Sequence, residues 1–230
     1  MKPVACCILS YEITKGMKSF GPIGLLKSSQ NAKELILHQI NNIKNIFNKY
    51  EIYVISGFLS DKLNKKLPDN IRRVFNPAYE TKNHGYAFKL ILSSINAEDY
   101  SGLFIIHNDT LIKYKNNKLP LNQSWILNKK YRNNNNDKRL GSITNSSGFV
   151  DYIFYDIGET EWCNSVFITS NDLVVMKKNI DQYYDNMFLF EIINKSIETN
   201  DIFYKPINIA YNEAITITGI KDKNKIKEYL

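Results

Sequence analysis

The sequence predicts a single α/β domain in which helices cover both faces of a doubly wound, mostly parallel sheet. Apolar segments of strand length alternate with amphipathic segments of helical length through the first half, which is typical of parallel crossovers. Two of the strand segments, Pro3–Leu9 and Leu103–Ile106, are apolar on both faces, as central strands are. The 230 residues suit one large domain with a substantial core.

In the first half, each element is predicted from its apolar spacing. The helix expected over 31–50 has an apolar stripe formed by Ile36, Ile40, Ile43 and Phe47. Asn76 and Pro77 stop the strand before them, because proline cannot continue a ladder. The expected strands are Pro3–Leu9, Ile52–Ile55, Arg72–Phe75 and a segment ending at Asp109, and the other helices are 60–67 and 84–95.

The second half is less regular. Residues 115–139 are rich in asparagine and lysine and resemble a solvated insertion or loop. The strands expected after it are 140–144, 150–155, 165–169, 202–204 and 214–218, and the helices are 171–180, 188–197 and 221–230. We therefore expect the regular half to bind a nucleotide and the irregular half to bind a second substrate.

Composition narrows the class of protein. The net charge of +7 comes from lysines dispersed among asparagine and isoleucine, so we interpret it as background rather than a nucleic-acid surface. Cys6, Cys7 and Cys163 are odd in number and contain no CxxC pair, which favours a reducing compartment. The apolar stretch Pro3–Leu9 is too short for a membrane span or a signal peptide. We expect a cytoplasmic protein without a membrane segment, and the sequence indicates no oligomeric state.

Asp109 is the first candidate functional residue. It follows directly on a buried strand, and open α/β sheets bind ligands at the carboxyl ends of their strands. The alternative is that Asp109 only caps a turn, since aspartate is common there. His107, at the same strand end, is expected to pack or to support a neighbouring group rather than act as a general base.

Several stretches together resemble the nucleotidyltransferases that join a nucleoside triphosphate to a sugar phosphate or phosphocholine. They are KGMKSFGPIGLL (15–26), NAKELILHQINNI (31–43), EIYVISGF (51–58), FNPAYETKNHGYAFKL (75–90), FIIHND (104–109) and ITITGIKDKNKIKEYL (215–230). The resemblance implies a single-domain, three-layer Rossmann-like fold of the nucleotide-diphospho-sugar transferase (GT-A) type, with a mixed, predominantly parallel sheet. It also implies a nucleotide-binding half, 1–114, and an acceptor-binding half, 115–230.

The resemblance assigns roles to matching residues. Asp109 would bind Mg²⁺ and act in catalysis, and Lys18 would replace the family's phosphate-binding arginine, keeping its charge but not its two-pronged geometry. The acceptor's own phosphate would be the nucleophile, so the resemblance implies no serine or cysteine nucleophile. The residues expected to bind the nucleotide or acceptor are Lys15, Gly16, Lys27, Asn83, His84 and Gly85, with helix capping as an equal alternative for Asn83. Trp162 and Glu161, with Tyr152 and Tyr155 for a choline-like group, are expected to line the acceptor pocket.

Two positions depart from the family pattern. Ile23 follows Pro22 where the family has a lysine, and Lys27 is the nearest substitute. Thr218 stands where the family has a second metal-binding aspartate, and Glu213 and Asp222 are the nearby carboxylates. The sequence thus leaves three hypotheses: a magnesium-dependent nucleotidyltransferase, a glycosyltransferase that uses a nucleotide sugar, and a non-catalytic nucleotide- or sugar-binding relative.

Overall fold

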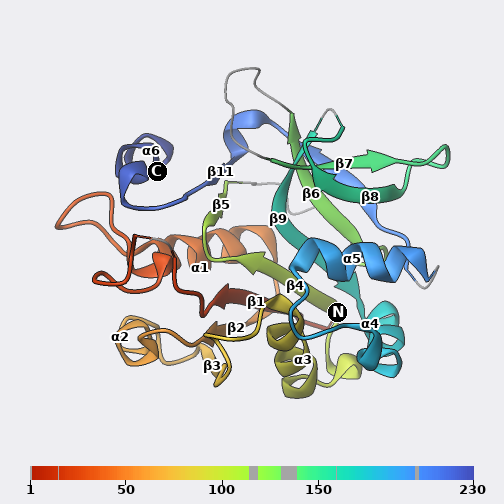
Figure 1. Cartoon of the computed structure of the whole chain (residues 1–230), viewed down its shortest axis with the longest axis horizontal. Helices are drawn as coiled ribbons and strands as arrows, with labels where there is room; N and C mark the ends of the chain where they lie inside the picture. The colour runs from red at the N-terminus through yellow and green to blue at the C-terminus, as the bar shows by residue number, and fades with distance from the viewer. Residues whose placement is uncertain (1, 15, 114–118, 131–138, 159, 200–201) are drawn as a thin grey trace.

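A computed structural model describes residues 2–14, 16–113, 119–130, 139–158, 160–199 and 202–230. Its nine-stranded sheet has the order β10-β6-β9-β4-β1-β2-β3, with β7 pairing to β9 and β8 to β7 (Figure 1). These strands are β1 Val4–Ser10, β2 Tyr50–Ser56, β3 Arg72–Phe75, β4 Gly102–His107, β6 Trp125–Lys130, β7 Leu140–Thr144, β8 Val150–Tyr155, β9 Thr160–Thr169 and β10 Lys205–Ile209. The predicted fold class, a single α/β domain with a mostly parallel central sheet, is confirmed.

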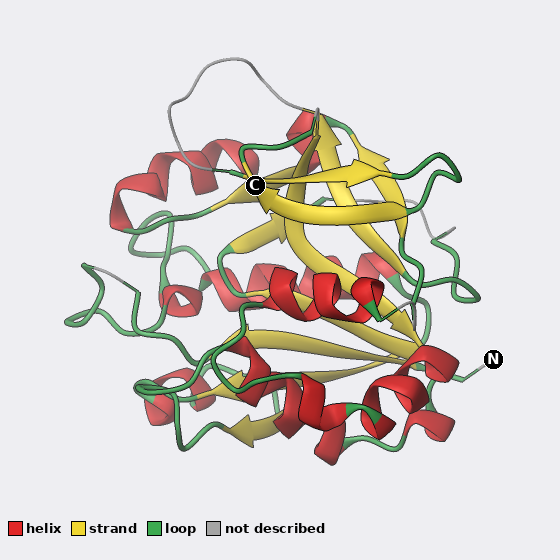
Figure 2. Ribbon diagram, turned by 45° about the vertical axis from the view of Figure 1, so that its right-hand side comes forward, coloured by secondary structure: helices red, strands yellow, loops and turns green. Residues whose placement is uncertain are grey.

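The two faces of the sheet bury separate apolar clusters. Along β1, Ala5, Cys7 and Leu9 belong to one cluster and the residues between them to the other, as the alternation of a strand requires. Helices α3 (His84–Ser94), α4 (Ser170–Lys178) and α5 (Leu189–Glu198) contribute to the first cluster. Helices α1 (Leu35–Ile46) and α2 (Ser60–Asn64) contribute to the second, so helices lie on both sides of the sheet (Figure 2).

The expectation of a solvated insertion over 115–139 is wrong for part of that segment. Residues 125–130 form β6, which lies between β9 and the edge strand β10. Trp125 is fully buried and stacks on Phe167, and its Nε1 donates a hydrogen bond to the Pro120 carbonyl at 2.8 Å. The sequence did not predict this strand because its apolar stretch, Trp125 to Leu127, is only three residues long and has polar neighbours. Residues 114–118 and 131–138 lie outside the described residues.

Other boundaries also differ from the predictions. The strand predicted at 202–204 lies instead at Lys205–Ile209, and the strand predicted to start at Ser165 starts at Thr160. Helix α1 begins only at Leu35, because residues 27 and 34 form an isolated bridge before it. No helix among the described residues is long and apolar enough to cross a membrane.

A second, two-stranded sheet pairs β5 (Thr110–Ile112) with β11 (Ala214–Thr216) in antiparallel register. It brings the chain after Asp109 beside the segment that leads into the C-terminal helix α6 (Lys223–Tyr229). A third apolar cluster joins this sheet and α6 to the loop after β1, through Met17, Ile23, Leu111, Ile217 and Ile226. The loop, the end of β4 and the C-terminal segment therefore meet at one edge of the main sheet.

Candidate active site

Asp109 lies at the carboxyl edge of the sheet, between β4 and β5. Strand β1 runs parallel to β4, with Leu9 opposite His107, so the loops after both strands start at the same edge. The Asp109 side chain is 20% exposed, and its Oδ1 accepts a hydrogen bond from the Thr110 hydroxyl at 2.7 Å. Its backbone carbonyl accepts a hydrogen bond from the Ile217 N–H at 2.7 Å, which fixes β11 beside it.

Three further side chains converge next to Asp109. Glu12, from the loop after β1, places Oε1 at 2.8 Å from His84 Nε2 and Oε2 at 3.2 Å from His107 Nε2. The other ring nitrogen of His107, Nδ1, lies 2.9 Å from Asp109 Oδ1. His84 comes from the first turn of α3, and its ring lies 5.2 Å from that of His107, centroid to centroid.

This cluster carries alternating charge. Burial lowers the pKa of His107, but Asp109 and Glu12 outweigh that effect, so the net pKa is raised well above its ordinary value. Burial conversely raises the pKa of Glu12 and of Asp109. Contacts with His107 and His84 nevertheless leave the pKa of Glu12 lowered, and contacts with His107 and Thr110 leave that of Asp109 lowered. His107 is therefore a cation held between two carboxylates, an arrangement that makes the partial burial of these three groups tolerable.

Sequence reasoning identified His84, His107 and Asp109 but not Glu12. The structure explains Glu12 through the strand pairing: β1 and β4 are adjacent, so an acid two residues past β1 lies next to the residues that follow β4. Both ring nitrogens of His107 face carboxylates, Nε2 facing Glu12 and Nδ1 facing Asp109.

Asn83 and Gly85, the other predicted residues at the start of α3, each make a structural contact with the chain before α5. The Asn83 side chain donates to the Asn186 carbonyl at 3.0 Å and makes no capping hydrogen bond to its own helix. A Cβ on Gly85 would lie 1.9 Å from the Tyr184 carbonyl oxygen. The close approach of the Tyr184 backbone therefore requires glycine at this position.

The predicted residues that follow β1 differ in their accessibility to a ligand. Gly16 has a φ of +78° and is exposed, as is Lys18, so both are accessible to a ligand. Lys15 lies outside the described residues. Lys27 is engaged elsewhere, because its Nζ lies 3.3 Å from Oε1 of the buried Glu34, which also receives Lys66 at 3.4 Å.

The Glu34 ion pairs predict a pH-dependent stability. Burial raises the pKa of Glu34, but its backbone hydrogen bond and the two lysines outweigh burial, and the pKa falls below its ordinary value of 4.5. A lowered pKa contributes stability that is complete above pH 4.5 and is lost as the pH falls through the folded-state value. We expect Glu34→Gln to lower the free energy of unfolding by about 1 kcal/mol at pH 7. This difference should shrink toward pH 3 in urea titrations.

Glu228→Gln, an exposed carboxylate on α6, is the matched control and should leave the free energy of unfolding unchanged across the same pH range. A wild-type to Glu34→Gln difference that stays constant from pH 7 to pH 3 would contradict the ion-pair interpretation of Glu34.

A pocket of about 290 Å³ lies beside β11, the strand that pairs with β5 after Asp109. Its wall includes Thr216 and Thr218 from the C-terminal segment and Glu161 and Trp162 from β9, and its cations are Lys129, Arg139 and Lys225. Lys129 is 8% exposed and its Nζ lies 3.1 Å from Glu161 Oε1. The predicted acceptor residues Glu161, Trp162 and Tyr155 share this pocket, whereas Tyr152 lines a different one.

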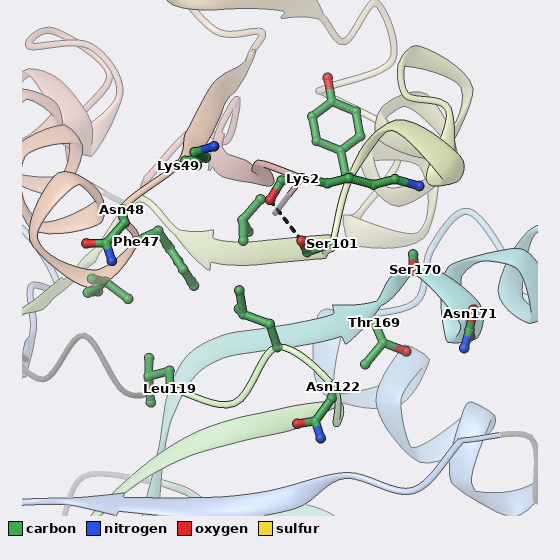
Figure 3. Close-up of a pocket in the computed structure, with 14 residues that line it drawn as sticks. Lys2, Phe47, Asn48, Lys49, Ser101, Leu119, Asn122, Thr169, Ser170 and Asn171 are labelled. Carbon is green, nitrogen blue, oxygen red and sulfur yellow. Dashed lines mark hydrogen bonds between the residues drawn. The ribbon is translucent and has the colours of Figure 1, made fainter.

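A larger cavity of about 650 Å³ lies at the opposite edge of the sheet, where β1 and β4 begin (Figure 3). Lys2, Phe47 and Lys49 line it together with the N-terminal end of α4. The Ser101 hydroxyl donates to the Lys2 carbonyl at 2.9 Å and closes one side. Among the residues that the structure describes, no predicted site residue lines this cavity.

Comparisons with known proteins identify the fold. No family model matches the sequence, and no curated protein matches it. Among solved structures, a CTP:phosphocholine cytidylyltransferase from Streptococcus pneumoniae aligns with a TM-score of 0.74 at 18% identity, over 99% of each chain. An inositol-1-phosphate CTP transferase from T. maritima aligns at 0.72 and 14% identity, over 100% of this chain and 95% of the other. A nucleoside-diphosphate-sugar pyrophosphorylase from Vibrio cholerae aligns at 0.72 and 12% identity, over 98% and 99%.

The chain has the nucleotidyltransferase fold. The resemblance noticed in the sequence is therefore confirmed for the fold over the whole chain.

Within this nucleotidyltransferase fold, the two departures from the sequence pattern have structural explanations. Ile23 is 2% exposed and packs in the third apolar cluster, so a lysine there would require a different path for the loop. Thr218 donates hydrogen bonds from its backbone N–H and its hydroxyl to Asp222 Oδ2, both at 2.7 Å. Glu213 Oε2 accepts from the Ala210 N–H, again a local contact. Over the described ranges, neither Glu213 nor Asp222 joins Asp109 in a group of three metal-binding side chains.

Proposed function

We propose that this protein transfers a nucleotidyl group from a nucleoside triphosphate to a phosphorylated small-molecule acceptor and releases pyrophosphate. The observation that carries the proposal is the position of Asp109. In a nucleotidyltransferase fold, this carboxylate lies at the carboxyl edge of the central sheet, and β11 links it to the cation-lined pocket. The lysine-bearing loop after β1 meets the same edge.

The proposed division of the site follows from charge. The triphosphate would lie along the exposed loop with Gly16 and Lys18, where backbone amides and a cation can face phosphate oxygens. The acceptor would occupy the pocket beside β11, where Lys129, Arg139 and Lys225 suit a phosphate. An oxygen of that phosphate then attacks the α-phosphorus, and the bond from the α-phosphorus to the bridging oxygen breaks as pyrophosphate leaves.

The residues present fit a magnesium ion that arrives with the triphosphate. Magnesium prefers oxygen ligands and retains several waters, so one carboxylate can suffice when phosphate oxygens complete the shell. Asp109 would hold it, because in the part of the chain that the structure describes no hydrogen bond reaches its Oδ2. The ion would offset the negative charge that develops on the leaving pyrophosphate.

The test is release of pyrophosphate. The purified protein is incubated with each nucleoside triphosphate, Mg²⁺ and a panel of acceptors comprising sugar 1-phosphates, phosphocholine and inositol phosphate. We expect pyrophosphate release that requires one triphosphate, one acceptor and the metal together. If no combination releases pyrophosphate and nucleotide sugars release a nucleoside diphosphate or monophosphate instead, the glycosyltransferase hypothesis replaces the proposal. Nucleotide binding that is independent of Mg²⁺ and unchanged by Asp109→Asn would identify a non-catalytic relative.

A further inference from the structure

A continuous chain of polar contacts runs from the start of α5 to Asp109. The Leu189 backbone N–H donates to His84 Nδ1 at 2.9 Å, and His84 Nε2 contacts Glu12 Oε1. The second oxygen of Glu12 contacts His107, and the far nitrogen of His107 reaches Asp109. Segments from four parts of the sequence thus meet in one row, which the proposed transfer reaction does not by itself require.

The contact between Leu189 and His84 shows which atoms donate and which accept along the chain up to Glu12. A backbone N–H can only donate, so His84 Nδ1 accepts and carries no proton. The proton of a neutral His84 is then on Nε2, and it is donated to Glu12 Oε1. Glu12 is an acceptor on both oxygens when ionised, so His107 Nε2 also donates to it.

These hydrogen-bond directions exclude a metal site as the alternative role of the cluster. Glu12, His84 and His107 present ligand atoms within 4.8 Å of one another, which is close enough to hold a metal ion. A metal-binding histidine, however, uses one nitrogen as a lone-pair donor and normally donates a proton from the other. His84 has the reverse arrangement, because its outer nitrogen accepts and its inner nitrogen carries the proton.

We propose that Glu12 and His107 are positioning residues for Asp109, and that His84 anchors them to the start of α5. His107 Nδ1 forms an ion-pair contact of 2.9 Å with Asp109 Oδ1, and the Thr110 hydroxyl donates to the same oxygen, so the carboxylate is held by one oxygen. The other oxygen, Oδ2, is thereby presented to the cation. This inference rests on the proposed function, since it assigns Asp109 the metal and the three other side chains the task of orienting it.

A matched pair of substitutions separates orientation from simple packing. In His107→Asn the amide nitrogen takes the place of Nδ1 and keeps the contact with Asp109, whereas in His107→Gln it takes the place of Nε2 and keeps only the contact with Glu12. We expect His107→Asn to keep kcat for pyrophosphate release within a few-fold of wild type. His107→Gln should lower kcat by roughly 10- to 100-fold.

The outcome that overturns the positioning role is an equal loss of kcat in both His107 variants, or a greater loss in His107→Asn. Thermal unfolding of both variants checks that neither has lost its fold. Glu12→Gln should lower kcat, as His107→Gln does, and should change KM for the triphosphate much less. The reason is that it disturbs the orientation of Asp109 rather than a contact with substrate.

A second measurement is independent of catalysis. The chain has three histidines, so ¹⁵N-histidine labelling gives three rings, which His38→Asn and His84→Asn variants assign. We expect the His84 ring to be the neutral tautomer protonated on Nε2 and to keep its resonances when Zn²⁺ is added. A proton on Nδ1, or joint shifts of His84 and His107 with Zn²⁺, would show a metal site and overturn the inference. A wild-type protein that releases no pyrophosphate overturns the proposed function, whereas this spectrum still decides the direction of the chain.

Discussion

Asp109→Asn should lower kcat/KM for pyrophosphate release by roughly 10²- to 10³-fold, the scale of removing one electrostatic contact to a transition state. Asparagine has nearly the shape of aspartate, and its Oδ1 can still accept from the Thr110 hydroxyl. What the variant lacks is the negative charge and the second carboxylate oxygen, the two properties that the proposed cation needs. Steady-state kinetics at several Mg²⁺ concentrations measures the loss.

The matched control is Asp69→Asn, an exposed aspartate in the turn before β3, which should keep wild-type kinetics. Thermal unfolding of Asp109→Asn should stay close to that of wild type, so that the lost activity is not a lost fold. Activity within a few-fold of wild type in Asp109→Asn would remove Asp109 from the proposed chemistry.

Lys129→Met should have the second-largest effect, on stability and on acceptor binding together. Lys129 and Glu161 are cross-strand partners on β6 and β9, and both side chains are mostly buried. Removing the lysine leaves the glutamate without its partner, which costs about 3 kcal/mol of unfolding free energy. The loss of a cation from the pocket should also raise KM for the phosphorylated acceptor by roughly tenfold.

The double variant Lys129→Met, Glu161→Met separates these two effects. Replacing both ions of a buried pair with apolar residues is often neutral, so the free energy of unfolding should return toward wild type. The acceptor KM should remain raised, because the cation is still absent. Lys130→Met, at the exposed neighbouring position, should change neither quantity. An acceptor KM restored in the double variant would mean that Lys129 only stabilises the strand pair.

The central strands could be predicted because their physical signal is local. The residues of β1 and β4 are apolar on both faces, and the isoleucines of α1 repeat at helical spacing, so neither needed a tertiary partner to be recognised. Strand β6 has no such signal, because only Trp125, Ile126 and Leu127 are apolar and asparagine and lysine follow. Burial of its polar end depends on partners such as Ser142 for Asn128 and Glu161 for Lys129, which sequence spacing does not disclose.

The site shows the same limit. Asp109 follows a recognisable strand, so its place at the edge of the sheet could be predicted. Glu12 could not, because its role depends on the register of β1 against β4 and on a histidine 72 residues away. The reason for Gly85 was also hidden, since the backbone that excludes a side chain there belongs to Tyr184 in the turn before α5.

The most direct test of the account is the position of a bound metal. Crystals grown with Mn²⁺ in place of Mg²⁺, together with a non-hydrolysable nucleoside triphosphate, give an anomalous signal that locates the ion without reference to activity. We expect one site at coordination distance from Asp109 and the phosphate oxygens. A manganese peak between Glu12, His84 and His107, or a triphosphate bound away from Asp109, would contradict it.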